Sequence, residues 1–162
     1  MHIRKALEID LPRIMEIYAG ARRFMAAQGN PRQWGATNWP PEELIREDIR
    51  RGACHVCQEE GRIVAVFFFA PGPDPTYRVI HEGAWAADTP YGVVHRIASD
   101  GTVKGAGSFC IHWAYGQCGH LRMDTHPDNA PMLHLLPALG FTRRGIIYVE
   151  EDDEPRIAFE KI

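Results

Sequence analysis

The sequence predicts an α/β (α+β) fold in the element order β-α-α-β-β-β-α-β-α-β-β. The length of 162 residues suits one domain that spans residues 1–162. A hydrophobic content of 45% and a charged content of 24% are ordinary for a globular chain. Helical and extended patterns alternate along the sequence without a linker, repeat or low-complexity tract.

The N-terminal half is predicted to contain a short strand, two helices and a hairpin. Asp10 and Pro12 are typical of a helix start. The apolar residues that follow recur on one helical face: Ile14, Ile17, Tyr18, Ala21 and Met25. The other expected ranges are a strand at 3–6, a loop at 29–41, a helix at 42–50 and hairpin strands at 54–59 and 62–70.

The C-terminal half is predicted to alternate strands and helices. A rigid proline-rich loop at 71–75 and a segment at 77–85, irregular or a short strand, come first. The expected elements are strands at 91–99, 121–126, 142–149 and 156–161, with helices over 108–115 and after Asn129. The acidic stretch 150–155 is predicted to be a solvated turn.

The strand at 91–99, the glycine-rich turn and the helix start after it form the most informative segment. Lys104, Gly105 and Gly107 close the turn. A helix start leaves about four backbone N–H groups without partners and carries a partial positive charge. Because glycines let a ligand approach that backbone closely, the segment predicts a phosphate-binding site. An ordinary strand-to-helix turn is the alternative.

The spacing of the turn separates it from two common nucleotide motifs. A Rossmann turn needs a third glycine where Cys110 stands, and a P-loop needs lysine after the glycine, whereas Lys104 precedes Gly105. The stretch Thr102-Val-Lys-Gly105-Ala-Gly107 resembles the acetyl-CoA pyrophosphate loop of GNAT N-acetyltransferases, Q/R-x-x-G-x-G/A. Thr102 replaces the usual Gln or Arg, and Lys104 can supply the missing positive charge.

A second stretch is similar to the GNAT pattern N-x-x-A-x-x-x-Y-x-x-x-G-F. Asn129, Met132, Gly140 and Phe141 stand at matching positions, and Leu136 replaces the tyrosine that is often the general acid. The order and spacing of both motifs extend the resemblance over about the whole chain. The resemblance implies a mixed, mostly antiparallel sheet flanked by helices, with acetyl-CoA as cosubstrate and no metal.

The resemblance also implies where the cosubstrate binds. In that fold the strand before the loop and the next strand splay apart, and pantetheine bonds to backbone groups of the first strand. The expected cofactor-binding residues are Ile97, Ala98, Ser99, Thr102, Val103, Lys104, Gly105, Ala106, Gly107, Ser108, Asn129 and Met132.

Acetyl transfer to an amine needs a neutral amine, donors for the oxyanion and a stabilised leaving thiolate. His95 is the first candidate base, because strand alternation puts it on one face with Tyr91 and Val93 and because imidazole titrates near neutrality. Glu82 is the second candidate, and Tyr91 and Tyr148 are candidates for the acid. The alternatives are a packed histidine, a surface-loop glutamate and buried phenols.

Asp124 and His126, on the next strand, are expected to support a partner or the splay rather than to act directly. The tryptophan-containing loop between the first two helices is predicted to cover the acceptor, and core anchoring of the loop is the alternative. The expected substrate-binding residues are Gln33, Trp34, Trp39 and Trp85.

Composition argues against several other classes. A formal net charge of −3 lacks the excess of positive charge that is typical of nucleic-acid-binding domains. Neither a membrane-spanning apolar run nor a signal peptide is predicted. The spacings of Cys54, Cys57, Cys110 and Cys118 favour buried thiols over a zinc site or disulfide framework, and a reducing cytoplasm is the simplest setting. The apolar strand 64–69 is expected to be sheet core, with an edge used in a homodimer as the alternative.

The sequence therefore predicts an acetyl-CoA-dependent N-acyltransferase that moves acetyl directly to the primary amine of a small molecule. Two alternatives stay open. One is a non-catalytic acyl-CoA-binding module or sensor, favoured by Leu136. The other is acetylation of peptide or protein N-termini, which prefers a wider groove.

Overall fold

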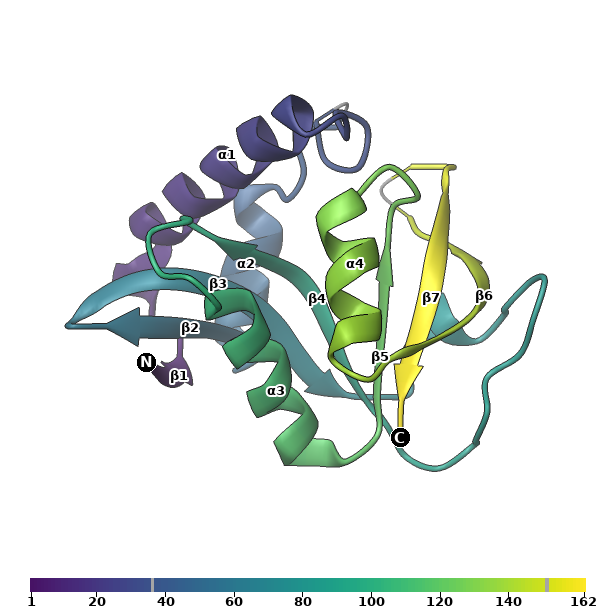
Figure 1. Cartoon of the computed structure of the whole chain (residues 1–162). Helices are drawn as coiled ribbons and strands as arrows, with labels where there is room; N and C mark the ends of the chain where they lie inside the picture. The colour runs from purple at the N-terminus through teal and green to yellow at the C-terminus, as the bar shows by residue number, and fades with distance from the viewer. Residues whose placement is uncertain (36, 151) are drawn as a thin grey trace.

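The computed structural model describes residues 1–35, 37–150 and 152–162 and confirms the predicted element order (Figure 1). The elements are β1 (His2–Lys5), α1 (Leu11–Ala27), α2 (Glu42–Arg50), β2 (Cys54–Glu59), β3 (Arg62–Pro71), β4 (Gly92–Ser99), α3 (Ala106–Cys118), β5 (Leu121–Thr125), α4 (Ala130–Ala138), β6 (Thr142–Tyr148) and β7 (Pro155–Lys161). Of the helices described, none has the length and apolar character that a bilayer crossing requires.

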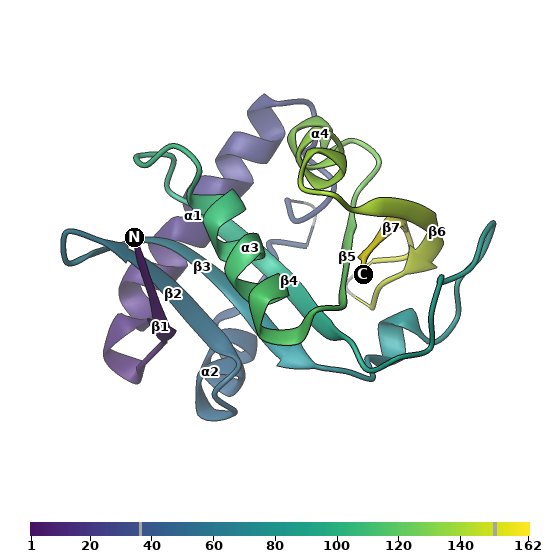
Figure 2. The same cartoon turned by 60° about the horizontal axis from the view of Figure 1, so that its bottom comes forward.

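One mixed sheet of seven strands has the order β1-β2-β3-β4-β5-β7-β6. All neighbouring pairs are antiparallel except β4 and β5, which run parallel. These two strands pair at Gly92–Leu121 and Val93–Arg122, near their N-terminal ends, and then diverge. The sheet therefore has two arms, β1–β4 and β5–β7, with an opening between them (Figures 1 and 2).

Two apolar cores bind the helices to the sheet. One joins α1 and α2 to β2 and β3, and includes Ile14, Ile45 and Val66. The other lies under α3 and α4 and includes Cys110 and Leu136. The strand 64–69 is sheet core, as expected, because β3 is paired on both sides by β2 and β4; the alternative of a free dimerisation edge is wrong.

A β-bulge interrupts β4 directly after His95. The register against β3 shifts by one residue between Val66 and Phe68, and Arg96 has a φ of 51°, in the left-handed region. The Arg96 guanidinium donates to Asp48 on α2 at 2.9 and 3.1 Å and lies 4.7 Å from the centre of the Phe68 ring. These contacts hold a backbone conformation that is unfavourable for a side chain with a Cβ.

The segment between β3 and β4 is irregular apart from a single turn at Pro75–Tyr77. His81 forms a backbone bridge to Ile146, so the segment lies along β6. Buried Glu160 on β7 accepts hydrogen bonds from the amide of Ala86 at 2.8 Å and from His120 at 2.7 Å. The part of the segment from His81 to Ala86 is thereby fixed beside the β5–β7 arm.

Candidate active site

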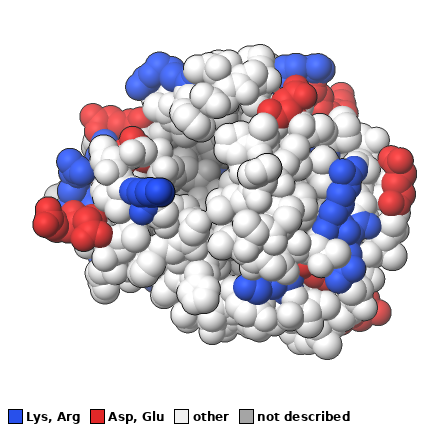
Figure 3. Space-filling view, viewed as in Figure 1, with Lys and Arg blue, Asp and Glu red and all other residues white. Residues whose placement is uncertain are grey.

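Two cavities meet where the arms of the sheet diverge. The larger, about 770 Å³, is lined by α1, the end of β4 and the N-terminal ends of α3 and α4. Figure 3 shows a hollow between α1 and α4 on this face. The smaller, about 390 Å³, is lined by the loop after α1, the central part of β4 and the end of β5. Of the residues described, four line both cavities: Met25, Ile97, Asn129 and Met132.

The glycine-rich turn opens into the larger cavity, called the cofactor cleft below. Gly105 caps α3 with a φ of 83°. In the part of the chain that the structure describes, the amides of Lys104, Gly105, Gly107 and Ser108 donate to no protein acceptor. A Cβ placed on Gly107 would meet nothing within 4 Å. Free amides at a helix start with open access form a good anion site.

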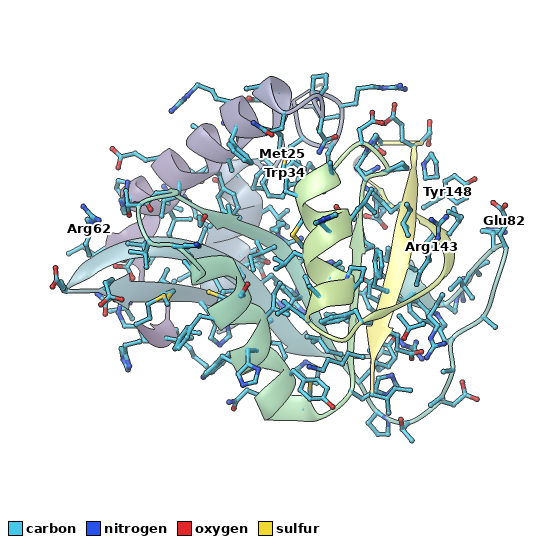
Figure 4. The ribbon with its side chains drawn as sticks, in the orientation of Figure 1. Met25, Trp34, Arg62, Glu82, Arg143 and Tyr148 are labelled. Atoms are coloured by element: carbon cyan, nitrogen blue, oxygen red, sulfur yellow. The ribbon has the colours of Figure 1, made fainter. Side chains whose placement is uncertain are left out.

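Two arginines reach this turn from distant parts of the sequence. Arg62 donates to the Thr102 hydroxyl at 3.1 Å, and Arg13 donates to Asp100 at 2.6 Å. Arg62 lies at the far end of the β1–β4 arm (Figure 4). The sequence motif indicates only Lys104 as the cation, because nothing near it predicts the positions of Arg13 and Arg62.

The predicted cofactor residues divide into two groups. Those that line the cleft are Ile97, Ala98, Ser99, Gly105, Gly107, Ser108, Asn129 and Met132. Thr102 and Lys104 are exposed on the turn, whereas Ala106 is buried in the core and Val103 packs against it. The side chains of Val103 and Ala106 therefore pack into the core under the turn. The turn itself presents mainly backbone amides to a ligand.

His95 lies in the smaller cavity, called the acceptor cavity below, between two carboxylates. Its Nε2 is 2.7 Å from Asp74 Oδ2, and its Nδ1 is 3.8 Å from Asp124 Oδ2. The Tyr77 hydroxyl donates to Asp124 at 2.6 Å. An ionised carboxylate only accepts hydrogen bonds, so Asp74 fixes the proton on Nε2 and leaves Nδ1 free to accept one.

The charge of Asp74 is strongly favoured in the folded state. Burial alone would raise the pKa of Asp74, but the hydrogen bond and charge of His95, with the Thr76 donors, lower it to about 2. The sequence does not indicate Asp74 as a partner of His95, because Asp74 lies in a proline-rich loop, 21 residues from His95, without a motif of its own.

This pairing predicts how stability depends on pH. The pKa of Asp74 is about 2 in the folded chain against an ordinary 3.8, so its contribution is complete above pH 3.8 and is lost as pH falls towards 2. We expect Asp74→Asn to be less stable than wild type at about pH 6, and the gap to close between about pH 4 and pH 2. Urea unfolding across this range measures it, with exposed Asp88→Asn as control. A gap that stays constant down to pH 2 would contradict the pairing.

Hydrogen bonds fix the loop between α1 and α2 over the acceptor cavity. The Gln33 side-chain oxygen accepts from Asn30 at 2.8 Å and from Asn129 at 2.9 Å. Trp34 is buried and meets Tyr18 edge to face. Gln33, Trp34 and Trp39 line the cavity. Trp34 is thus both a core anchor of the loop and a wall of the cavity.

The remaining predicted residues lie apart from the cavities, among the residues described. Glu82 is exposed on the segment before β4, and Tyr148 is 52% exposed at the end of β6; Figure 4 shows both on the side of the molecule away from Met25 and Trp34. The structure therefore places neither Glu82, the second candidate base, nor Tyr148, a candidate acid, in the described lining of a cavity. For Glu82, the reason is that the backbone bridge of the neighbouring His81 to Ile146 holds this part of the segment along β6.

Tyr91 and Trp85 are also displaced from the expected positions. The Tyr91 hydroxyl accepts from the amide of Asp74 at 2.9 Å, and its ring lies 4.0 Å from the Arg122 guanidinium. The Trp85 ring lies 4.2 Å from the same guanidinium, and its indole N–H donates to the Tyr77 carbonyl at 2.9 Å. Both aromatic rings therefore support the Asp74 and Tyr77 backbone rather than line the acceptor cavity.

Leu136 is fully buried, so position 136 presents no group to either cavity. His126 is buried and bonds to Glu154, on the connection between β6 and β7. Cys54, Cys57, Cys110 and Cys118 are free thiols, and no group of three or more His, Cys, Asp or Glu suited to a metal occurs among residues 1–35, 37–150 and 152–162.

Solved structures provide the comparison with known proteins. No protein-family model matches the chain, and no curated protein is significantly similar in sequence. A GNAT-family acetyltransferase from Streptococcus agalactiae 2603 is 29% identical with a TM-score of 0.82, over 99% of this chain and 94% of that one. A putative acetyltransferase from Staphylococcus aureus Mu50 is 18% identical with a TM-score of 0.71, over 99% and 98%. A ribosomal-protein-alanine N-acetyltransferase from Brucella melitensis is 20% identical with a TM-score of 0.61, over 100% and 99%.

This chain, with its mixed sheet that opens between two parallel strands, has the fold of the acetyltransferases in these comparisons. The chain belongs to the GNAT superfamily.

Proposed function

We propose that the chain is an acetyl-CoA-dependent N-acyltransferase that moves an acetyl group directly from the thioester to the primary amine of a small molecule. The observation that carries the proposal is the junction of two cavities. One has the free amides of a helix start, and the other holds His95 between Asp74 and Asp124.

The cofactor cleft suits coenzyme A. Its pyrophosphate fits the amides of Gly105, Gly107 and Ser108, and the open side of Gly107 gives it room. Pantetheine fits beside the end of β4, from Ile97 to Ser99, where β5 has diverged and leaves the edge of that strand uncovered. The thioester then lies at the junction of the cavities.

Within the acceptor cavity, His95 acts as the base. Nδ1 takes the proton of the attacking amine, Asp74 holds the tautomer, and Asp124 stabilises the imidazolium that forms. Attack forms the N–C bond, and collapse of the tetrahedral intermediate breaks the C–S bond. Coenzyme A leaves as a thiolate, and because a thiol has a pKa of about 8.5, departure at neutral pH does not require the acid missing at Leu136.

The loop between α1 and α2 narrows the acceptor cavity, which favours a small molecule over a protein N-terminus. The loop that covers it is tied to α4 through Gln33 and Asn129, and Trp34 is buried. A polypeptide acceptor needs an open groove, which this loop narrows. The ribosomal-protein acetyltransferase named above shares the fold, and its acceptor is therefore a rival to be tested.

The test is acetyl-CoA-dependent thiol release with a panel of small primary amines and an alanine-terminated peptide. We expect release with at least one small amine and none above background with the peptide. Release with the peptide alone would overturn the acceptor class. Tight binding of acetyl-CoA without turnover on any amine would favour the second candidate, a non-catalytic acyl-CoA sensor, which the missing tyrosine at Leu136 supports.

A further inference from the structure

The four residues shared by the two cavities differ in how firmly they are held. Asn129 is fixed at both ends of its amide, since its oxygen accepts from the Met132 amide at 3.3 Å and its nitrogen donates to Gln33 at 2.9 Å. Ile97 follows the bulge in β4. Met25 and Met132 are partly buried, and methionine has three rotatable side-chain bonds. The adjustable part of the junction is therefore these two side chains, called the methionine collar below.

The collar brings together the two arms of the molecule. Met25, near the end of α1, packs against the core that contains Ile14 and Trp34. Met132, in the first turns of α4, packs against the core that contains Leu136. Figure 4 shows Met25 beside Trp34, between the C-terminal end of α1 and α4. The collar therefore bounds the passage from the cofactor cleft to the acceptor cavity on two sides.

This position has a consequence that rests on the proposed function. The cosubstrate enters through the cofactor cleft and the amine lies in the acceptor cavity, so the acyl group has to lie at the collar. We propose that Met25 and Met132 set the acyl length, so that an acetyl group fits between them and a longer acyl chain is rejected. A longer chain has to displace the Met25 and Met132 side chains from the cores against which they pack, at a cost in packing contacts.

Shortening either side chain is expected to widen the acyl range. The acceptor cavity of about 390 Å³ lies directly beyond the collar and has space for further methylenes. Each buried methylene is worth about a factor of four in affinity. Butyryl is two methylenes longer than acetyl, which corresponds to a factor of about sixteen at full burial, so opening the collar should favour butyryl-CoA by roughly an order of magnitude relative to acetyl-CoA.

The experiment measures dissociation constants by calorimetry for CoA, acetyl-CoA and butyryl-CoA, and needs no acceptor. The proteins are wild type, Met25→Ala, Met132→Ala and the control Met15→Ala. Met15 lies on the same helix and packs against the same core as Met25, but lines neither cavity among the residues described. Wild type should bind acetyl-CoA more tightly than butyryl-CoA, and both collar variants should shift the ratio about tenfold towards butyryl-CoA. Met15→Ala should keep the wild-type ratio.

A bulkier side chain gives an independent test that does not depend on a cavity surviving in the core. Met132→Phe should weaken the binding of acetyl-CoA by a larger factor than the binding of CoA, which has no acyl group. If both alanine variants still bind acetyl-CoA and keep the wild-type ratio of the acetyl-CoA and butyryl-CoA dissociation constants, the collar does not set the acyl length. The proposed function would then still stand. Failure of wild type to bind CoA or either thioester would overturn both.

Discussion

Replacing His95 with glutamine is expected to lower kcat for acetyl transfer by roughly a hundredfold or more, with little change in the affinity for acetyl-CoA. Glutamine can still donate to Asp74 but does not take a proton from the amine at neutral pH. His95 lies in the acceptor cavity and outside the residues that line the cofactor cleft, so binding of the cosubstrate should be preserved.

The measurement is steady-state kinetics with the amine that the panel identifies, together with the pH dependence of kcat/KM. His112→Gln is the matched control, since His112 is exposed on α3 and, among the residues described, lines neither cavity. The control should retain wild-type kinetics. An unchanged rate and pH profile in His95→Gln would indicate that water or Asp124, and not His95, removes the proton from the amine.

Replacing Gly107 with tryptophan is expected to weaken acetyl-CoA binding by about a hundredfold or more. The indole would fill the open space over the helix start and block access to the amides of Gly105 and Ser108. Two hydrogen bonds to a charged group, at about 1.5 kcal/mol each, correspond to this loss. The fold should be unaffected, because a Cβ at Gly107 meets no atom within 4 Å.

Calorimetric titration with acetyl-CoA, alongside thermal unfolding without ligand, separates the two effects. Gly116→Trp is the control, since Gly116 lies on the same helix, is exposed and also has nothing within 4 Å of a Cβ. Both variants should unfold near the wild-type temperature, and only Gly107→Trp should lose affinity. If Gly107→Trp binds acetyl-CoA with wild-type affinity, the start of α3 is not part of the cofactor site.

The fold was predictable because each element has a local signal. Apolar side chains from Ile14 to Met25 repeat at helical spacing, and Gly61 marks the hairpin. The glycine-rich turn likewise follows from its own residues, since Gly105 does adopt a left-handed conformation at the cap of α3. Differences of one to three residues at element ends, the largest at the end of α3, reflect fraying and capping.

The site was less predictable because its partners are distant in sequence. His95 was found from strand alternation, but Asp74 reaches it through an irregular loop that has no periodicity. Glu82 was proposed because aromatic residues lie near it in sequence. The backbone bridge from His81 to Ile146 instead carries that segment to β6, and short-range sequence does not encode such a bridge.

The most direct test of the acyl-CoA site is the melting temperature of the wild-type chain titrated with acetyl-CoA, CoA, ATP and NAD. A ligand that binds only the folded state stabilises it by about 2.7 kcal/mol at a hundred times its dissociation constant. We expect acetyl-CoA and CoA to raise the melting temperature at concentrations where ATP and NAD do not. No shift with acetyl-CoA and CoA in a well-folded sample, or an equal shift with ATP or NAD, would contradict the assignment of the cleft to coenzyme A.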